Sequence, residues 1–187
     1  MFVYFGIKND LCGLLSTVYN MTRIGIMSDT HGYLSPKVFD YFKDCDEVWH
    51  AGDIGTLALA DELAAFKPLR AVYGNIDNDK IRRVYPLNLY FKVEEVRVFM
   101  THIASKPPRY PKRVQQCLAA YDELPNIFVC GHSHILQVAR AAPYGNMLHV
   151  NPGAAGKKGF HRVCTLVRLA IDGARIFDFE VIEFSRY

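Results

Sequence analysis

Polar motifs that stand directly after strand-like apolar runs are the feature that most constrains how this chain can fold. Five such motifs occur, at residues 28–32, 50–53, 74–77, 100–102 and 131–134. Most of the runs before them are rich in valine, isoleucine and other residues that favour strands. Open sheets place their sites at the carboxyl ends of their strands, so we expect the motifs to meet at one edge.

The motifs contain seven side chains that can bind a metal ion. They are Asp29, His31, Asp53, Asn75, His102, His132 and His134. Residues i and i+2 of an extended chain point the same way, so Asp29 and His31 should converge on one ion. The same argument applies to His132 and His134. Oxygen and imidazole ligands without thiolate suit Mn, Fe, Zn, Co or Ni, of which we expect Mn first.

The order of the remaining segments predicts an α/β fold. Helices are expected at 36–43, 57–66 and 112–121, the first opened by Ser35 as N-cap and Pro36 as the first helical residue. Strands are expected at 23–28, 47–50, 69–73, 127–131, 135–141, 147–150, 162–170 and 174–184, and two more within 88–100. Strands and helices alternate in the first half, whereas the second half is mostly strands. Two packed sheets flanked by helices would satisfy this pattern.

The motif order Asp-x-His, Gly-Asp, Gly-Asn, His and Gly-His-x-His resembles that of the calcineurin-like metallophosphoesterases, in particular their small single-domain bacterial and archaeal phosphodiesterases. The resemblance implies a four-layer α/β/β/α sandwich of two mixed β-sheets flanked by helices. It also implies two divalent metal ions. Asp29, His31 and His134 would hold one metal ion. Asn75, His102 and His132 would hold the other. Asp53 would bridge the two ions.

The same resemblance implies a phosphodiesterase that hydrolyses a small phosphodiester or nucleotide by attack of a metal-bridging hydroxide. Asp53, Asn75 and His102 would be the catalytic residues. A phosphomonoesterase with the same site is an alternative, because nearby cations would suit the extra negative charge of a monoester. A metal-binding scaffold with little catalysis is another, since a eukaryotic retromer subunit shares this fold. The presence of all the ligand positions favours an enzyme.

The segment 105–113 follows the ligand His102 and contains several cations and one aromatic ring. Lys106 and Arg109 are therefore candidates for binding a substrate phosphate or base. A proline-stiffened, solvated connection explains the segment equally well. If the first interpretation holds, replacement of Arg109 by alanine will raise KM without changing the metal content.

One position departs from the family pattern. Many calcineurin-like enzymes have a histidine directly after the Gly-Asn motif, where it protonates the leaving group, but this chain has Ile76 followed by Asp77. Because isoleucine cannot donate a proton, we expect hydrolysis to depend strongly on the pKa of the leaving group. Asp77 is the first alternative acid to test.

Three further histidines receive other interpretations. His50 is either a residue that orients the ligands or a core histidine with its hydrogen bonds satisfied. His149 lies in a predicted strand and is interpreted as structural. His161 is interpreted as a solvated loop residue.

Bulk properties limit the class of protein and its partners. The 187 residues suit a single domain at 21–187, with 1–20 as an N-terminal arm or an upstream extension. A net charge of +3 is too weak to predict nucleic-acid binding. No apolar run approaches the length of about 18 residues that a membrane span needs. Five cysteines without a CxxC pair indicate reduced thiols in a cytoplasmic protein. Aromatic residues near the C-terminus suit either a contact between copies of the chain or core packing: Phe177, Phe179, Phe184 and Tyr187.

Overall fold

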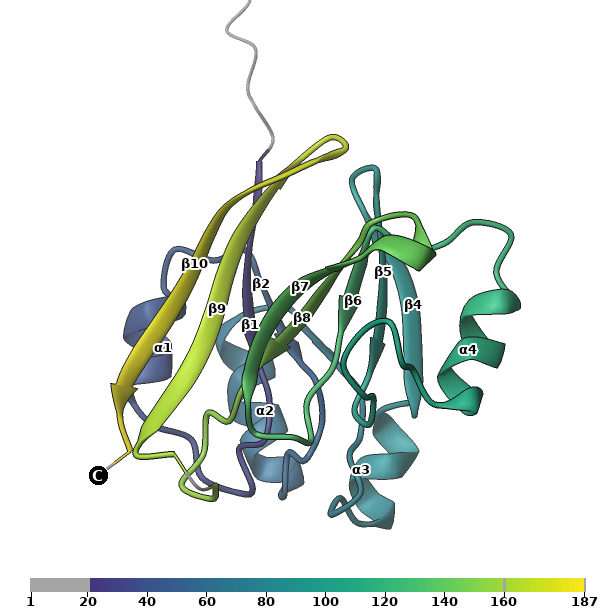
Figure 1. Cartoon of the computed structure of the whole chain (residues 1–187). Coiled ribbons are helices and arrows are strands. Elements are labelled where there is room, and N and C mark those ends of the chain that lie inside the picture. Colours follow the sequence, from purple (N-terminus) through teal and green to yellow (C-terminus); the bar gives the residue numbers. More distant parts are fainter. Residues whose placement is uncertain (1–20, 160, 187) are drawn as a thin grey trace, which may run out of the picture.

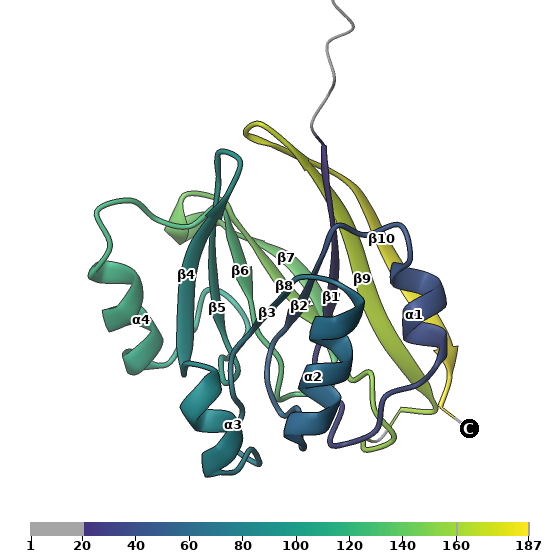
Figure 2. The same ribbon diagram turned by 180° about the vertical axis from the view of Figure 1, so that it is seen from behind.

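The computed structural model describes residues 21–159 and 161–186. These residues form two five-stranded β-sheets that pack face to face, with helices on the outer faces (Figure 1 and Figure 2). This four-layer α/β/β/α sandwich confirms the predicted fold class. The predicted arm at residues 1–20 lies outside the described residues.

The first sheet contains the strands that precede the first three motifs. In spatial order its strands are β10 (Arg175–Ser185), β9 (Val163–Asp172), β1 (Thr22–Met27), β2 (Glu47–His50) and β3 (Leu69–Ala71). β1, β2 and β3 are parallel, whereas β9 pairs antiparallel with both β1 and β10. Parallel neighbours need a crossover connection. Helices α1 (Lys37–Phe42) and α2 (Leu57–Phe66) provide these connections.

The second sheet contains the strands that precede the last two motifs. In spatial order its strands are β4 (Asn88–Val93), β5 (Val96–Thr101), β6 (Ile127–Val129), β8 (Met147–Pro152) and β7 (Leu136–Ala141). β5, β6 and β8 are parallel, and β4 and β7 are antiparallel edge strands. Helix α4 (Lys112–Ala119) connects β5 to β6, and a 3₁₀ turn at Ala142–Tyr144 joins β7 to β8. Both sheets are therefore mixed, as predicted.

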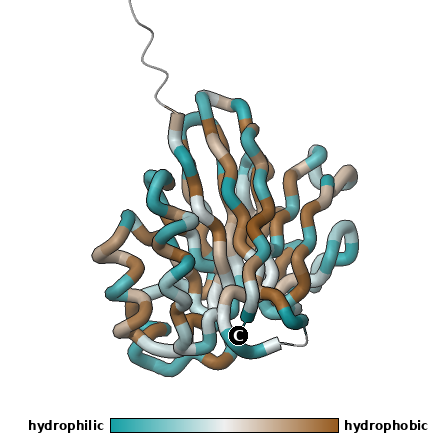
Figure 3. The backbone as a smooth tube through the Cα atoms, turned by 90° about the vertical axis from the view of Figure 1, so that its left-hand side faces the viewer, coloured by the Kyte–Doolittle hydropathy of each residue, from teal (hydrophilic) through white to brown (hydrophobic). Residues whose placement is uncertain are grey.

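Apolar side chains of the strands hold the two sheets together. Ile24 and Trp49 of the first sheet share a buried cluster with Val98 and Val129 of the second, and all four are fully buried. Burial of one such side chain contributes about 1.5–3 kcal/mol to stability. The hydrophobic stretches along the strands are visible in Figure 3. This core fixes the spacing of the sheets, and therefore of the loops at their ends.

The helices pack on the outer faces through two further clusters. Phe42 of α1 and Leu63 of α2 are buried against the first sheet. Leu118 of α4 is buried with Phe128 on the outer face of the second sheet. In Figure 3 the helices alternate hydrophobic and hydrophilic residues, as expected for helices with one buried face.

Two details of the helices differ from the predictions. Ser35 does not cap α1 with its side chain; Pro36 is the N-cap, and the carbonyl of Ser35 accepts the N–H of Val38 instead. An additional short helix, α3 (Asp79–Val84), follows the third motif and was not predicted. Its N-cap Asn78 accepts hydrogen bonds from the N–H groups of residues 80 and 81.

Other predictions concern the remaining segments. Strand β3 ends at Ala71 rather than at residue 73, and β8 continues to Pro152. The four cysteines in the described residues are all free thiols. Phe184 is buried in the core, whereas Phe179 is exposed. In the described part of the chain, none of the helices has the length and apolar character needed to cross a membrane.

Candidate metal centre

The motifs gather at one end of the sandwich, the lower end in Figure 1, where the parallel strands of both sheets finish. The chain does not remain extended there. Five of the candidate ligands have left-handed backbones with φ between 50° and 68°: Asp29, His31, Asp53, His132 and His134. Each such residue costs of order 1–3 kcal/mol, and this strain is typical of functional sites. The two-residue repeat of a strand therefore does not explain how these side chains meet, although Asp29 and His31 do fall in one ligand group as predicted.

Backbone hydrogen bonds hold the first two motifs beside each other. The N–H of Asp29 donates to the carbonyl of Gly52 at 3.0 Å, and the N–H of His31 donates to the carbonyl of Asp53 at 2.9 Å. In a third hydrogen bond, the N–H of Gly32 donates to the carbonyl of Ile54 at 2.8 Å. The pairing compensates for the strained turns and fixes the separation of the two carboxylates.

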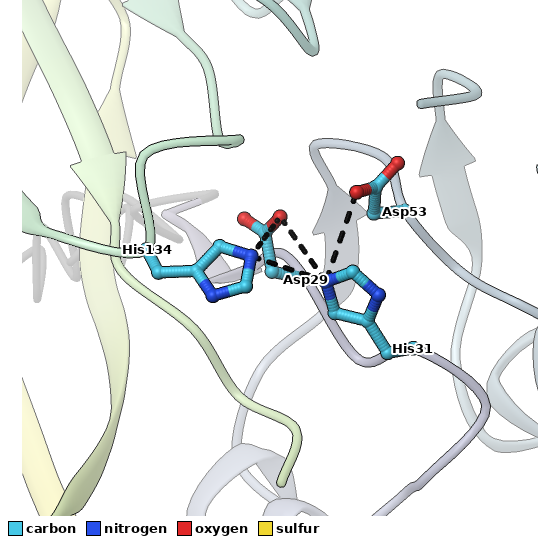
Figure 4. Close-up of side chains that lie close together, drawn as sticks. All are labelled: Asp29, His31, Asp53 and His134. Atoms are coloured by element: carbon cyan, nitrogen blue, oxygen red, sulfur yellow. Dashed lines mark hydrogen bonds and ion pairs between the residues drawn. The ribbon is translucent and has the colours of Figure 1, made fainter. Parts of the chain in front are cut away.

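The first ligand group consists of Asp29, His31, Asp53 and His134, which point toward one another in Figure 4. The Nε2 atoms of His31 and His134 are 3.1 Å apart. Asp29 Oδ1 lies 3.2 Å from His134 Nε2 and 3.8 Å from His31 Nε2. One ligand atom from each residue falls within 4.8 Å of all the others. This arrangement can hold one cation.

The second ligand group consists of Asp53, His102 and His132. His102 Nδ1 donates to the carbonyl of Ala51 at 2.7 Å, which leaves Nε2 bare and facing the carboxylates. Asp53 Oδ1 is 3.2 Å from His102 Nε2. Asn75 is exposed and lines the same cavity as His102.

Asp53 belongs to both groups. Its Oδ1 faces His102, and its Oδ2 lies 3.7 Å from His31 Nε2. The N–H of Ile76 also donates to Oδ1, at 3.1 Å. Burial would raise the pKa of Asp53, but the neighbouring His102 ring and the N–H of Ile76 hold it below its usual value. An ionised carboxylate placed in this way can bridge two cations.

His132 and His134 separate into different groups. The spacing argument placed them on one ion, whereas the structure places His134 with Asp29 and His132 with His102. The left-handed backbone at both residues turns the second side chain away from the first. This grouping is the one that the family resemblance implies.

The unsatisfied atoms of the site fit a cation. Asp29 Oδ1 and His102 Nε2 are buried and have no hydrogen-bond partner. A buried charged oxygen without a partner is costly. Burial lowers the pKa of His102, but the Asp53 and Asp29 carboxylates raise it overall, and the adjacent Asp29 carboxylate raises the pKa of His134. Both carboxylates thus favour positive charge at the points where a divalent ion would bind.

His50 orients the loops rather than facing the ligands. It is fully buried, and its Nδ1 accepts the N–H of Gly52 at 3.2 Å. The proton on Nε2 then points to the hydroxyl of Thr30 at 2.9 Å, and that hydroxyl reaches the carbonyl of Ile54 at 3.0 Å. Burial lowers the pKa of His50 to about 4, so the ring is neutral at pH 7. Both interpretations of His50 fit these contacts, because the ring is buried with both nitrogens hydrogen-bonded and supports residues of the first two motifs.

The side chain of Asp77 is hydrogen-bonded to backbone N–H groups. Its carboxylate accepts three N–H groups, from Ile54 at 3.1 Å, Gly55 at 2.7 Å and Gly74 at 2.8 Å. Asp77 is buried, and its hydrogen bonds tie the second motif to the third. A carboxylate used in this way is poorly suited to donate a proton, which argues against the role of alternative acid.

Close approach explains two of the glycines. A Cβ on Gly74 would lie 2.0 Å from Asp53 Oδ1, and one on Gly131 would lie 2.0 Å from Ser28 Oγ. No side chain fits at either position without displacing the carboxylates or their support.

His149 and His161 are not part of the ligand groups. His149 is buried, stacks on Phe128 and meets the Tyr110 hydroxyl at 3.0 Å, as the structural interpretation predicted. Burial lowers its pKa to about 4. Asn151 supports the last motif, since its amide donates to the carbonyl of Gly131 at 2.8 Å.

The cations of the segment 105–113 lie in different places. Lys106 lines a cavity beside the last motif, together with Ser133. Arg109 is exposed and lines neither this cavity nor the one at Asn75. Arg113, which the sequence did not single out, lines the cavity at Asn75 and His102. Its position in the first turn of α4 was the only available signal.

Comparisons of the sequence relate the chain to known proteins. A model of the calcineurin-like phosphoesterase superfamily domain matches residues 22–174. A probable metallophosphoesterase of Methanothermobacter thermautotrophicus is 30% identical over 166 residues, which cover 85% of this chain and 91% of that protein.

Solved structures share the fold. A conserved protein of Streptococcus pneumoniae, described as a predicted phosphoesterase, has a TM-score of 0.63 and 25% identity, with 89% of this chain and 90% of that chain covered. Vps29 of Entamoeba histolytica in complex with Zn²⁺ has a TM-score of 0.65 at 15% identity, with 89% of this chain and 100% of that chain covered.

Proposed function

The chain belongs to the calcineurin-like phosphoesterase superfamily, and on that premise we propose that it is a phosphodiesterase that uses two divalent cations, with Mn²⁺ the first choice. The observation that carries the proposal is the position of Asp53, whose two oxygens face different ligand groups. When bound, two such cations lower the pKa of a shared water and neutralise phosphoryl oxygens.

Each residue of the candidate centre would have a separate role in binding the two cations. Asp29, His31 and His134 would hold one cation, and Asp53 would bridge to the other. His102, His132 and Asn75 would complete the second position. Because His102 Nδ1 is fixed by the carbonyl of Ala51, its Nε2 is already oriented, which reduces the reorganisation needed on binding. Neutral imidazoles and only two carboxylates would leave the centre with a net positive charge that attracts an anionic ester.

The cavity at Asn75 and His102 suits a diester better than a monoester. A monoester carries an additional negative charge and needs additional cations. Among the residues that line the cavity at Asn75 and His102, the only charged side chain besides histidine is Arg113, and the other walls are mainly apolar. A small phosphodiester or nucleotide, with one charge and an organic group on each side, suits such walls better.

The test is hydrolysis of bis(p-nitrophenyl) phosphate by protein stripped with a chelator, before and after Mn²⁺ is restored. Activity should appear only with metal, and the Asp53→Asn variant should lose at least about 100-fold in kcat. Asp61→Asn, at an exposed position of α2, is the matched control and should behave like the wild type. Metal analysis should give two ions per chain in the wild type and fewer in Asp53→Asn. Turnover of p-nitrophenyl phosphate at a higher kcat/KM would instead indicate a phosphomonoesterase.

A metal-binding scaffold is the second candidate. The observation in its favour is that large apolar side chains are exposed around Asn75, namely Ile76, Leu87 and Ile103. A protein partner could cover such a surface. Two bound ions together with no hydrolysis of any phosphate ester would support the scaffold and contradict the proposed activity.

A further inference from the structure

A cavity of about 260 Å³ opens beside the second ligand group. Asn75 and His102 form the wall nearest the centre, and Leu87, Ile103 and Arg113 form others. Pockets for whole drug-sized ligands measure about 300–1,000 Å³, so this cavity suits a single ring system rather than a long chain. Its contents would lie within reach of a phosphate held by the metal centre.

The walls of the cavity expose apolar surface next to a charged site. Leu87 is 39% exposed and Ile103 is 40% exposed. Ile76, which follows Asn75, is 45% exposed. Single exposed apolar residues are common and need no explanation. Three of them around one ligand residue form a surface whose contact with water is unfavourable unless an apolar group covers it.

Arg113 adds a flat, charged wall. One Nη donates to Asn88 Oδ1 at 2.8 Å, and the other donates to Thr101 Oγ1 at 3.1 Å and to the carbonyl of Ile103 at 3.2 Å. Within the described residues no carboxylate forms an ion pair with this guanidinium. The N–H donors of a guanidinium lie in its plane, so these hydrogen bonds fix its orientation without occupying the faces, which can stack on an aromatic ring.

We propose that this cavity, which we call the aromatic pocket, binds the planar aromatic group of an organic phosphate. The inference rests on the proposed function only for the location of the phosphate. Leu87 and Ile103 would enclose the ring, and Arg113 would stack against it while its positive charge attracts the anion. A phenyl-type ring and a nucleobase share this chemistry. The pocket therefore predicts that the substrates are aromatic or nucleoside phosphate esters rather than alkyl esters.

The test is calorimetric titration of the Mn²⁺-loaded protein with phenylphosphonate and with methylphosphonate, neither of which can be hydrolysed. The wild type should bind phenylphosphonate about tenfold more tightly or better. The double variant Leu87→Asn/Ile103→Asn should reduce this ratio to about twofold, with methylphosphonate affinity unchanged. A second titration compares adenosine 5′-phosphate with ribose 5-phosphate and tests whether the pocket binds a nucleobase.

A matched control excludes a general effect of surface polarity. Val138 is 41% exposed and Val181 is 38% exposed, and both lie on edge strands outside the cavity. The double variant Val138→Asn/Val181→Asn should keep the tenfold ratio. Melting temperatures of both double variants establish that each is folded.

The outcomes separate the inference from the proposed function. Equal affinity for both phosphonates would overturn the aromatic pocket, even in a protein that hydrolyses diesters. A strong preference for phenylphosphonate without any hydrolysis would support the pocket and overturn the enzyme. Absence of phosphonate binding would overturn the aromatic pocket but not the enzyme, which the hydrolysis of bis(p-nitrophenyl) phosphate tests separately. A preference that survives Leu87→Asn/Ile103→Asn would place the ring elsewhere and overturn the pocket.

Discussion

Replacement of Asp77 by asparagine is expected to lower the melting temperature by roughly 6–12 °C, because Asp77 joins two of the ligand motifs. Its Oδ2 accepts the N–H groups of Ile54 and Gly74, and its Oδ1 accepts that of Gly55. Asparagine keeps one oxygen and presents an N–H₂ group in place of the other. At least one buried N–H then loses its acceptor, and the remaining bonds lose their charge.

The magnitude follows from these bonds. An unsatisfied buried N–H costs about 1–3 kcal/mol, and a bond to a charged acceptor is worth about 1 kcal/mol more than one to a neutral acceptor. The sum is about 3 kcal/mol. For a domain of this size, each kcal/mol lowers the melting temperature by about 2–4 °C.

Calorimetry measures the loss of stability, and a series of aryl phosphodiesters measures the chemistry. Since Asp77 acts through the position of the loops, Asp77→Asn should slow all the esters by a similar factor, whatever the pKa of the leaving group. Asp79→Asn is the matched control at an exposed residue of α3, and it should change the melting temperature by less than about 2 °C.

The result that would refute this reasoning is specific. If Asp77→Asn melts within about 2 °C of the wild type and slows only the esters with poor leaving groups, Asp77 is the proton donor. The three backbone hydrogen bonds would then contribute little to stability.

Three further predictions concern protons, metal and packing. His50 and His149 have pKa values of about 4 in the fold against 6.5 when free, so the unfolded chain binds their protons first, and stability should fall by roughly 6 kcal/mol between pH 7 and pH 4 in urea titrations; a flat profile would contradict their burial as neutral rings. Mn²⁺ at about 100 times its Kd should stabilise the protein by about 2.7 kcal/mol and raise the melting temperature of chelator-treated protein by roughly 5–11 °C, whereas no shift would argue against a metal centre. Gly74→Ala should reduce the metal content, because the new Cβ would lie 2.0 Å from Asp53 Oδ1. Gly173→Ala is the control, since its Cβ would have no neighbour within 4 Å. It should lower the free energy of unfolding by only about 1 kcal/mol and leave the metal content unchanged.

The fold was largely predictable because its pattern is carried by many residues at once. Apolar runs at the positions of β1, β2 and β5 needed only their composition and their order to be recognised. Helix α3 was missed because its six residues contain two apolar side chains, Ile81 and Val84, too few to show a helical period. Its signals were local: Asn78 as N-cap and basic residues in the last turn.

Six of the seven predicted ligand positions fall in the two ligand groups of the structure, but the geometry of those groups was not predictable. Motif order predicted the positions, whereas it gave no indication of the left-handed backbone at His132 and His134. Nothing in the local sequence requires φ above zero at a histidine. Arg113 rather than Arg109 reaches the cavity at Asn75, because α4 buries Val114 and Leu118 and so fixes which side of its first turn faces β4 and β5. The rotation of α4 about its own axis is set by tertiary packing and cannot be predicted from the local sequence.

The division of the ligands between the two sheets links the candidate metal centre to the stability of the fold. Asp29, His31, Asp53 and Asn75 follow strands of the first sheet, and His102, His132 and His134 follow strands of the second. Across the middle of the sandwich, the sheets contact each other through apolar side chains, whose packing is not directional. At this end the contacts between sheets are polar and directional, such as His102 to Asp53 and His134 to Asp29. A cation shared by these pairs would be bound only when both sheets are correctly docked, so its binding energy would act on the sheet–sheet interface as a whole.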